Sequence, residues 1–329
     1  MGIQKQRDTA IADEVDDSSQ ASGTFKAEII AGLKHTPKRI QSKFFYDERG
    51  SRLFEEITLL EEYYLTRVEI EILQKYLSEM AALIGPKAVV IEFGTGAGVK
   101  TRMLIEALDK PKSFIPIDIS REQLNEASRE LAARFPSLDI RPVCADYTST
   151  IAIPLDSETA GKKIVFFPGS TIGNFTPEEA VGFLRQVAKL AGPDGALLIG
   201  FDRNKSTKVL EDAYNDNLGI TAKFNLNLIH RINREFAVNI PVENFDHFAF
   251  FNNDESRIEM HLISRVEQTL MLGGEEIHLG AGEHIITEYS YKYSSPAFQG
   301  LLGSSGFVVQ ARWTDSNGYF EVCYCITKS

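Results

Sequence analysis

The sequence has few cysteines, and their number and spacing exclude a disulfide scaffold and a cysteine-based metal centre. The 329 residues include three of them: Cys144, Cys323 and Cys325. Cys323 and Cys325 are two positions apart, so we expect them on one face of a strand, in the core. The six histidines show no H-x-x-H or H-E-x-x-H spacing. We therefore expect no bound metal, and unpaired thiols are typical of a reducing cytosol.

Long apolar runs and an excess of positive charge are also missing. No run approaches the ~20 apolar residues of a membrane-spanning helix, and no signal-peptide pattern follows Met1. The net charge of −11 argues against a nucleic-acid backbone as the main partner, and we interpret the short basic cluster 34–39 as a solvated face. We expect a cytoplasmic protein without membrane or nucleic-acid partners. The sequence leaves the oligomeric state open, and a monomer is compatible with it.

The most informative stretch of the chain is residues 88–102. An apolar run ends at Glu92, and glycine then occupies every second position: Gly94, Gly96 and Gly98. A helical pattern follows. Glycine is needed where the chain turns sharply and a ligand lies against bare backbone. We therefore predict a nucleotide cofactor at this strand-to-helix turn.

The spacing of these glycines indicates which cofactor the turn holds. A dinucleotide fingerprint reads G-x-G-x-x-G, and Val99 occupies the place of its third glycine. The spacing G-x-G-x-G behind an acid is instead the form used by S-adenosylmethionine (SAM) methyltransferases. SAM has no pyrophosphate, and an acid can face its cationic methionine end. We predict SAM, with Glu92, Gly94 and Gly96 at its site; a dinucleotide, or a tight turn without ligand, is the alternative.

Two further acids follow the next predicted strands. Asp118 lies near the end of segment 113–119, roughly 20 residues past the glycine turn, where an acid binds ribose hydroxyls. Asp146 and Tyr147 follow segment 140–143, and an acid beside an aromatic ring suits the amino group and ring face of adenine. Parallel strands present their carboxyl ends at one edge of a sheet. We therefore expect these side chains to lie near the glycine turn.

Strands alternate with helices from residue 89 to 202, which predicts a parallel α/β sheet. A helical stretch at 208–235 leads into β-rich sequence, and the chain ends in a hairpin that turns at 316–318. A terminal antiparallel hairpin is how the sheet of class I SAM-dependent methyltransferases ends. We predict this Rossmann-like, seven-stranded fold with a second α+β domain. The expected divisions are a disordered tail at 1–22, a substrate-binding domain at 23–67 plus 205–292, and a SAM-binding domain at 68–204 plus 293–329.

Five motifs spread along the chain resemble one family, over roughly residues 24–327. They are Phe44-Phe45-Tyr46-Asp47, Glu62-Tyr63-Tyr64-Leu65-Thr66-Arg67, Gly169-Ser170-Thr171-Ile172-Gly173-Asn174, Arg257-Ile258-Glu259-Met260 and Thr287-Glu288-Tyr289-Ser290. The family that they resemble is the L-histidine Nα-methyltransferases of ergothioneine biosynthesis. The resemblance implies transfer of three methyl groups from SAM to the α-amine of free L-histidine, which gives hercynine.

The resemblance also implies roles for single residues. The pair that binds the substrate carboxylate is matched by Asn174 and Tyr214. The pair that holds the imidazole is matched by Glu288 and Ser290. Positions around the ring are matched by Tyr63, Phe224 and Met260. The groups near the amine are matched by Tyr46, Gly169 and Thr171. The contacts to SAM are matched by Gly94, Lys100, Asp118, Asp146 and Tyr147.

Glu288 is expected to determine the choice of substrate. In a strand, Glu288 and Ser290 point the same way, and an acid beside a hydroxyl can pair with both ring nitrogens of histidine. Phenylalanine would leave both groups unpaired. The alternative for Glu288 is a surface residue in an ion pair. Alternatives for the protein are methylation of another amino acid, such as a tryptophan derivative, or SAM binding without catalysis, which a blocked substrate pocket would indicate.

The chemistry requires a neutral amine held about 3 Å from the methyl carbon. A free α-amine is mostly protonated at neutral pH, and Tyr46 is the candidate to accept or relay the proton through water. The aromatic faces of Tyr46 and Phe224 are expected to stabilise the growing quaternary ammonium. Leu65 stands where several relatives have proline, and we expect it to stay clear of the chemistry.

Overall fold

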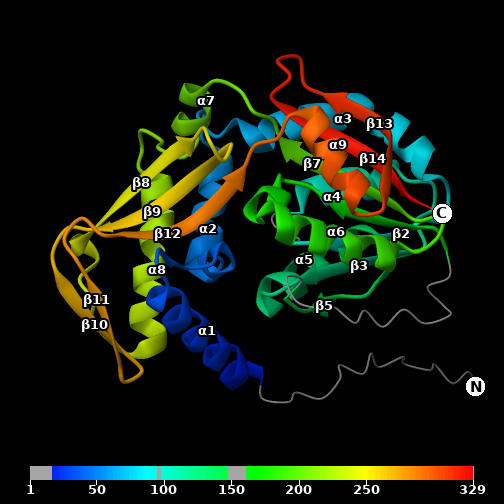
Figure 1. Ribbon diagram of the computed structural model, residues 1–329. Coiled ribbons are helices and arrows are strands. Elements are labelled where there is room, and N and C mark those ends of the chain that lie inside the picture. Colours follow the sequence, from blue (N-terminus) through cyan, green and yellow to red (C-terminus); the bar gives the residue numbers. More distant parts are fainter. Residues whose placement is uncertain (1–16, 95–97, 147–160, 329) are drawn as a thin grey trace, which may run out of the picture.

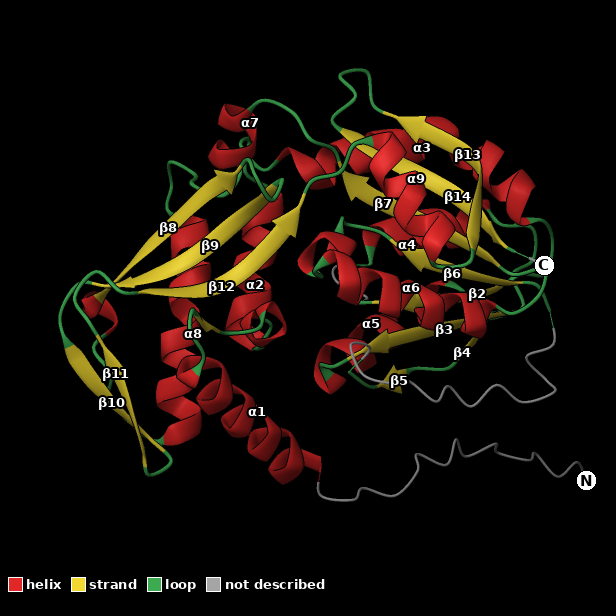
Figure 2. Ribbon diagram, viewed as in Figure 1, coloured by secondary structure: helices red, strands yellow, loops and turns green. Residues whose placement is uncertain are grey.

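The computed structural model of the protein describes residues 17–94, 98–146 and 161–328. Gly96 and Tyr147, both predicted to bind the cofactor, lie outside these described residues. Two main sheets with helices around each, and a separate two-stranded ribbon, form the described chain (Figures 1 and 2). We call them the large sheet and the small sheet, and the site lies between them.

The large sheet runs through the carboxyl-terminal and central parts of the chain. Its strands are β2 (Val89–Phe93), β3 (Ser113–Asp118), β4 (Asp139–Ile140), β5 (Val143–Cys144), β6 (Lys163–Phe167), β7 (Ala196–Asp202), β13 (Phe307–Thr314) and β14 (Phe320–Thr327). Their order is β13-β14-β7-β6-β2-β3-β4, with β5 also paired to β3. Strands β2 to β7 are parallel, and β14 lies antiparallel between β7 and β13.

This order confirms the predicted class I methyltransferase sheet and its terminal hairpin. Cys323 and Cys325 are buried in β14, as predicted. In place of the single strand expected at 140–143 there are two, β4 and β5, so the described chain has eight strands here rather than seven. Both short strands pair with β3, so together they occupy the edge of the sheet where the single strand was expected.

Helices cover both faces of the large sheet. Successive side chains of its strands therefore point into two different cores. Val90 packs in one core, whereas Val89 and Ile91 pack in the other. The first face carries α3 (Tyr64–Ile84), α4 (Val99–Ala107) and α5 (Arg121–Arg134). The second face carries α6 (Pro177–Ala191) and α9 (Ser295–Ser304).

The small sheet has the order β1-β12-β9-β8. Its strands are β1 (Lys38–Arg39), β8 (Phe245–Asn252), β9 (Arg257–Ser264) and β12 (His284–Tyr291), and a ribbon of β10 (Gln268–Leu272) and β11 (Glu275–Leu279) extends from it. Helices of this part are α1 (Asp17–Lys34), α2 (Glu48–Thr58), α7 (Thr207–Asp212) and α8 (Ile220–Phe236). Short 3-10 turns are η1 (Ser42–Phe45), η3 (Thr171–Asn174) and η4 (Val242–Asn244).

Two boundaries differ from the predictions. Helix α1 begins at Asp17, inside the segment expected to be a disordered tail. The helical stretch predicted at 208–235 is two helices: α7 ends at Asp212, and α8 begins at Ile220 after Gly219, which has φ +66°. The assignment of the two parts as substrate-binding and SAM-binding domains stays a prediction.

The chain crosses between the two sheets at adjacent positions. Arg203 after β7 forms a parallel bridge with Tyr293 after β12. The N–H of Asn204 donates to the carbonyl of Tyr293 at 3.1 Å, and the N–H of Tyr293 donates to the carbonyl of Asp202 at 3.2 Å. This crossing brings the end of β12 to the carboxyl edge of the large sheet.

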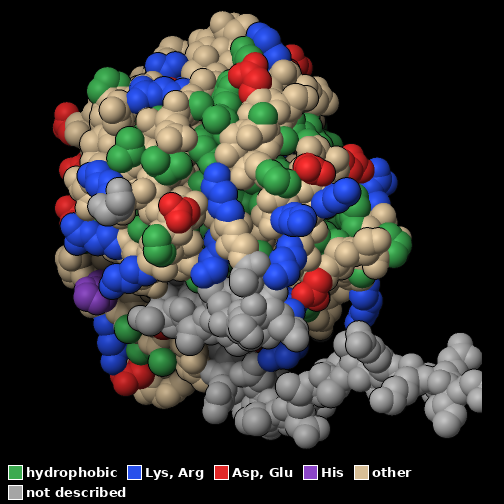
Figure 3. Space-filling model, turned by 90° about the vertical axis from the view of Figure 1, so that its right-hand side faces the viewer, with side chains coloured by type: hydrophobic (Ala, Val, Ile, Leu, Met, Phe, Trp, Pro, Cys, Tyr) green, Lys and Arg blue, Asp and Glu red, His purple; other side chains and the backbone are tan. Residues whose placement is uncertain are grey.

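Neither the length of the helices nor the distribution of surface charge indicates a function. No helix within the three described ranges is long and apolar enough to span a membrane. Lys and Arg side chains are spread over the face shown in Figure 3, with acidic and hydrophobic side chains between them.

Candidate active site

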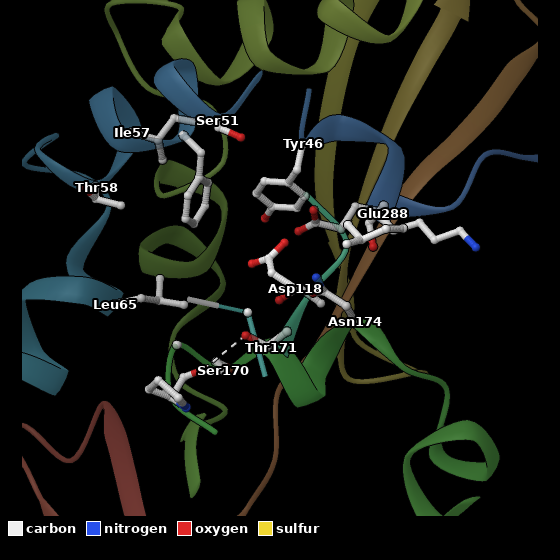
Figure 4. Close-up of a pocket in the computed structure, with 18 of the residues that line it drawn as sticks. Tyr46, Ser51, Ile57, Thr58, Leu65, Asp118, Ser170, Thr171, Asn174 and Glu288 are labelled. Carbon is white, nitrogen blue, oxygen red and sulfur yellow. Dashed lines mark hydrogen bonds between the residues drawn. The ribbon is translucent and has the colours of Figure 1, made fainter. Parts of the chain in front are cut away.

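A large cavity lies between the carboxyl edge of the large sheet and the small sheet, with a volume of about 2210 Å³. Every predicted site residue in the described part of the chain lines it. Figure 4 shows Tyr46, Asp118, Asn174 and Glu288 directed toward one common space from four separate elements. The cofactor end and the substrate end predicted from the sequence therefore belong to one cavity. No described residue fills it, which argues against SAM binding without catalysis.

The glycine turn forms one end of this cavity. Gly94 has φ +76°, and its N–H donates to the carbonyl of Ile117 at 2.8 Å. Gly98 precedes α4 with φ +65°. Residues with a Cβ rarely adopt such φ values, which explains why glycine occupies both positions. Asp118 ends β3 beside the turn, where its Oδ1 accepts the N–H of Ser120 at 2.9 Å.

Glu92 is turned into the protein and tied to α4. Its two carboxylate oxygens lie 2.9 and 2.7 Å from Thr101 Oγ1, which donates to them. Burial raises the pKa of Glu92 to about 8, and the hydrogen bond from Thr101 opposes this shift. Glu92 thus anchors the first turn of α4 behind the glycine loop, a contact that the sequence analysis did not foresee. Its role toward SAM stays a prediction.

Asp146 is joined to the N-terminal part of the chain through Lys43. Lys43 Nζ donates to Asp146 Oδ2 at 2.9 Å and lies 2.8 Å from Glu28 Oε2 of α1. Burial lowers the pKa of Lys43, but its bonds to Glu28 and Asp146 outweigh this and raise it above the ordinary value. Lys43 and Glu28 could not be identified from the sequence, because Asp146 is 103 residues from Lys43.

A buried carboxylate from α3 supports the cavity between the glycine turn and η3. Glu69 is 1% exposed and accepts a hydrogen bond from Lys100 Nζ. Its two oxygens also accept the N–H of Gly169, at 3.1 and 2.9 Å. Gly200 in β7 leaves room for this side chain, since a Cβ there would collide with Glu69. Glu69 therefore positions two predicted site residues, and nothing in the pattern of its helix distinguishes it from a surface acid.

The loop from Gly169 to Asn174 packs closely on β12. Gly169 has φ +82°. A Cβ at Gly173 would lie 2.9 Å from the carbonyl oxygen of Tyr291, so glycine is required for this approach. The Thr171 hydroxyl donates to the backbone carbonyl three residues earlier at 3.1 Å. Thr176 and Glu179 form the capping box of α6. Asn174 takes no part in this cap, and its amide is directed into the cavity (Figure 4).

Aromatic rings form another part of the wall. The ring centroid of Tyr46 lies 5.9 Å from that of Phe224 and 5.6 Å from that of Phe54, both edge-on. Tyr63 lies 6.1 Å from Phe54 and 6.3 Å from Tyr214. Burial raises the pKa of the Tyr63 and Tyr214 phenols, which keeps both neutral. The structure thus brings the predicted aromatic residues together and adds Phe54 to them.

Glu288 and Met260 are cross-strand neighbours of β12 and β9 at the substrate end. Both are buried, with 9% and 1% exposure. No group in the described part of the chain hydrogen-bonds the Glu288 carboxylate, which points into the cavity (Figure 4). Burial raises its pKa to about 7, with Lys292 opposing. Because Glu288 is buried and has no ion pair among the described residues, its interpretation as a surface ion-pair residue is wrong.

Behind Ser290 lies a buried polar network that the sequence analysis missed. Ser290 Oγ lies 2.9 Å from both Tyr214 Oη and Lys292 Nζ. Lys292 Nζ also lies 3.0 Å from Asp202 Oδ2, and the side chains of Lys292 and Asp202 are fully buried. Lys205 Nζ donates to the other Asp202 oxygen at 2.5 Å. The alternation of positions 288 and 290 in β12, continued to 292 just past its end, was the signal that could have identified Lys292.

The cavity fits SAM. A bare-backbone turn, an acid at the end of β3 and Lys100, which the buried Glu69 holds from behind, line its cofactor end. Among the described residues, no three His, Cys, Asp or Glu side chains are grouped to hold a metal ion. Leu65 is buried and lines the same cavity, so it lies closer to the site than its sequence suggested.

The sheet order, the glycine turn and the cavity define a class I SAM-dependent methyltransferase. A family model described as histidine-specific methyltransferase, SAM-dependent, matches residues 25–327, and the chain belongs to this family. A histidine N-alpha-methyltransferase of Mycolicibacterium smegmatis is 37% identical over 94% of this chain and 97% of its own length. Ergothioneine biosynthesis protein 1 of Neurospora crassa is 32% identical over 87% of this chain and 33% of its own. The L-tryptophan methyltransferase trpM of Psilocybe serbica is 25% identical over 90% of each chain.

Proposed function

We propose that the protein transfers three methyl groups from SAM to the α-amine of free L-histidine, giving hercynine, the first step of ergothioneine biosynthesis. The observation that carries this proposal is the buried Glu288 carboxylate, which faces the same cavity as the glycine turn. With Ser290 beside it, this wall suits a ring that has two nitrogens. The histidine methyltransferase of M. smegmatis supports the choice of substrate.

SAM supplies an electrophilic methyl group when bound, and the chain must hold a neutral amine in line with it. We assign the binding of SAM to Glu92, Gly94, Gly96, Lys100, Asp118, Asp146 and Tyr147. Asn174 is assigned to the substrate carboxylate with Tyr214 beside it. Met260 and Tyr63 are assigned to packing against the ring. Glu69 supports this arrangement by holding Lys100 and Gly169 together.

The amine must lose a proton before each transfer, and we assign the relay of that proton to Tyr46. Gly169 and Thr171 lie at the same part of the cavity wall. As methyl groups accumulate, the product becomes a quaternary ammonium, which the edge-packed rings of Tyr46 and Phe224 would stabilise by cation–π contact.

A tryptophan derivative is the alternative substrate, and the similarity to trpM favours it. The buried Glu288 carboxylate disfavours it, because an indole would leave that group with too few partners. Replacing Glu288 and Met260 together by apolar or aromatic residues should shift preference toward tryptophan. An unchanged preference for histidine would remove both residues from the specificity role.

The proposal is tested by incubating the purified protein with SAM and each amino acid separately, and by identifying products by mass spectrometry. A gain of three methyl groups on histidine alone is the expected result. Methylation of another amino acid would keep the fold and cofactor but discard the role of Glu288. No product at all would favour a protein that binds SAM without catalysis.

We also propose that this reaction occurs in the cytosol, with a small amino acid as the partner rather than a membrane or a nucleic acid, and with the protein as a monomer. The net charge of −11 supports the choice of a small partner. Cys323 and Cys325, which are buried close together in β14 and form no disulfide, support a reducing compartment.

A further inference from the structure

The hydroxyls of Ser290 and Tyr214 form a closed triangle with the ammonium group of Lys292. Tyr214 Oη donates to Ser290 Oγ at 2.9 Å, and Lys292 Nζ donates to Ser290 Oγ at 2.9 Å and to Tyr214 Oη at 3.2 Å. The third donor position of the ammonium is taken by Asp202, 3.0 Å away. Ser290 and Tyr214 line the cavity, whereas Lys292 and Asp202 lie behind them. The ammonium therefore reaches a ligand only through the two hydroxyls.

This triangle determines which hydrogen bond Ser290 can make with a ligand. A serine hydroxyl has one proton and two lone pairs. Tyr214 and Lys292 occupy both lone pairs, so only the proton is left for the cavity. Glu288, two positions earlier on the same face of β12, offers the opposite property, since a carboxylate accepts. The wall of the pocket thus presents one donor beside one acceptor.

We propose that Lys292, held by Asp202, is a positioning residue that makes Ser290 a donor and so restricts the pocket to the uncharged form of the substrate's imidazole ring. This inference rests on the proposed function. A neutral imidazole has one N–H for Glu288 and one bare nitrogen for Ser290. An imidazolium has two N–H groups, and the second would face the proton of Ser290. Because the Tyr214 hydroxyl donates its hydrogen bond to Ser290, it cannot also donate to the substrate carboxylate, and of the pair expected there only the Asn174 amide is left as a donor.

Several charged and titratable groups surround the Lys292–Asp202 pair, and a pH experiment must separate them from the ring. On the large-sheet side they are Lys205 and Tyr64, and on the pocket side Tyr214 and Glu288. If both ligands bind with a neutral ring, these groups titrate alike in the two complexes, and their contribution cancels from the ratio of the two affinities. The ratio then follows the protonation of the free histidine ring.

The experiment measures binding by isothermal titration calorimetry to protein saturated with S-adenosylhomocysteine. The two ligands are L-histidine and its triazole analogue, triazolylalanine, whose ring stays neutral at both pH values used. With a ring pKa near 6.5, roughly nine-tenths of histidine is imidazolium at about pH 5.5 and almost none at about pH 8. If only the neutral ring binds, the affinity for histidine relative to the analogue falls about tenfold between these two pH values.

Substitutions identify the residue responsible. In Lys292→Met, Ser290 regains a lone pair and can accept an N–H, so the fall in relative affinity should shrink to less than about threefold. Lys205→Met is the matched control: it removes a buried ammonium from the same Asp202 but contacts neither Ser290 nor Tyr214, and should keep the tenfold fall. Ser290→Ala removes the donor itself and should shrink the fall as Lys292→Met does, which provides the answer if the latter does not fold.

Two results would overturn the inference: a relative affinity in the unmodified protein that does not change with pH, or a tenfold fall that persists in both Lys292→Met and Ser290→Ala. Either result alongside methylated histidine would leave the proposed function standing. Failure of both ligands to bind, with no methylated histidine formed, would instead reject the proposed function.

Discussion

Lys43 Nζ and Asp146 Oδ2 lie 2.9 Å apart, so the segment before α2 is tied to the end of β5. Glu28 of α1 holds the same ammonium from its other side. A residue predicted to bind the adenine end of SAM is thereby oriented by a part of the chain that precedes the methyltransferase sheet. The first prediction tests this dependence.

Lys43→Met should weaken SAM binding about threefold to tenfold. The pair is partly buried, with side-chain exposures of 15% and 29%, and such pairs contribute on the order of 1 kcal/mol. Calorimetry with S-adenosylhomocysteine measures the effect. Lys34→Met removes an exposed pair with Glu275 and should leave affinity unchanged. Equal affinities in both variants would show that Asp146 does not depend on Lys43.

Glu69→Gln should lower kcat/KM for SAM by at least about tenfold, because it removes the negative charge that holds Lys100 in a buried position. Steady-state kinetics at saturating histidine report the change. Glu106→Gln breaks an exposed pair with Arg134 and serves as the control, since exposed pairs contribute little. A Glu69→Gln enzyme with normal kcat/KM would exclude a positioning role for this carboxylate.

Glu288→Gln should make the ligand-free protein more stable at about pH 8 while abolishing activity on histidine. The folded-state pKa of about 7 lies above the ordinary 4.5, so the folded protein binds this proton more tightly than the unfolded chain. Ionisation therefore destabilises the fold progressively between about pH 4.5 and pH 7, by about 3 kcal/mol at most. Glutamine does not ionise, so the variant avoids this loss of stability. Its advantage over the unmodified protein should vanish near pH 4.5, where Glu288 is protonated in the folded protein.

Urea denaturation at about pH 5 and about pH 8 measures this difference. The control is Glu283→Gln, since a hydrogen bond from Lys38 lowers the pKa of that carboxyl. Loss of the Glu283 charge should lower the free energy of unfolding at neutral pH, whereas Glu288→Gln should raise it. A Glu288→Gln variant that is less stable than the unmodified protein at both pH values would contradict the origin we give for the shift.

Gly173→Ala should lower the free energy of unfolding by about 1–3 kcal/mol, the range for overpacking a well-packed site. The added Cβ would lie 2.9 Å from the Tyr291 carbonyl oxygen, and displacing the loop moves Asn174, so KM for histidine should rise. Chemical denaturation and steady-state kinetics measure the two effects. Gly300→Ala in α9 meets no atom within 4 Å and should stabilise instead. Equal stability of the two variants would rule out the tight contact.

The sequence predicted the large sheet well because its signals are local. Apolar segments, the glycine turn and the terminal hairpin each lie within a few residues, and both faces of the sheet are buried, which makes the pattern strong. The same argument placed Asp118 and Asp146 at strand ends. Glu288 and Ser290 were matched by resemblance, and their shared face followed from strand alternation.

The supporting residues were not predictable because their partners are far away in the chain. Glu69 is 100 residues from Gly169, and Tyr64 is 138 residues from Asp202. Before the fold is known, each is an ordinary polar residue of a helix or strand. They are buried only because the chain packs in three dimensions, so the pattern of apolar residues along the sequence does not indicate their roles.

The bridge between Arg203 and Tyr293 means that residues 205–292 leave and rejoin the large sheet through neighbouring positions. A segment with adjacent ends can be exchanged between relatives as one cassette, because the junction geometry does not depend on what lies inside. The pairing of Lys38 with Ile285 shows what such a graft must carry along: the N-terminal segment that completes the small sheet. Chimaeras built on these joints would test whether substrate choice moves with this segment or also needs Tyr46, Tyr63 and Asn174, which line the cavity from outside it.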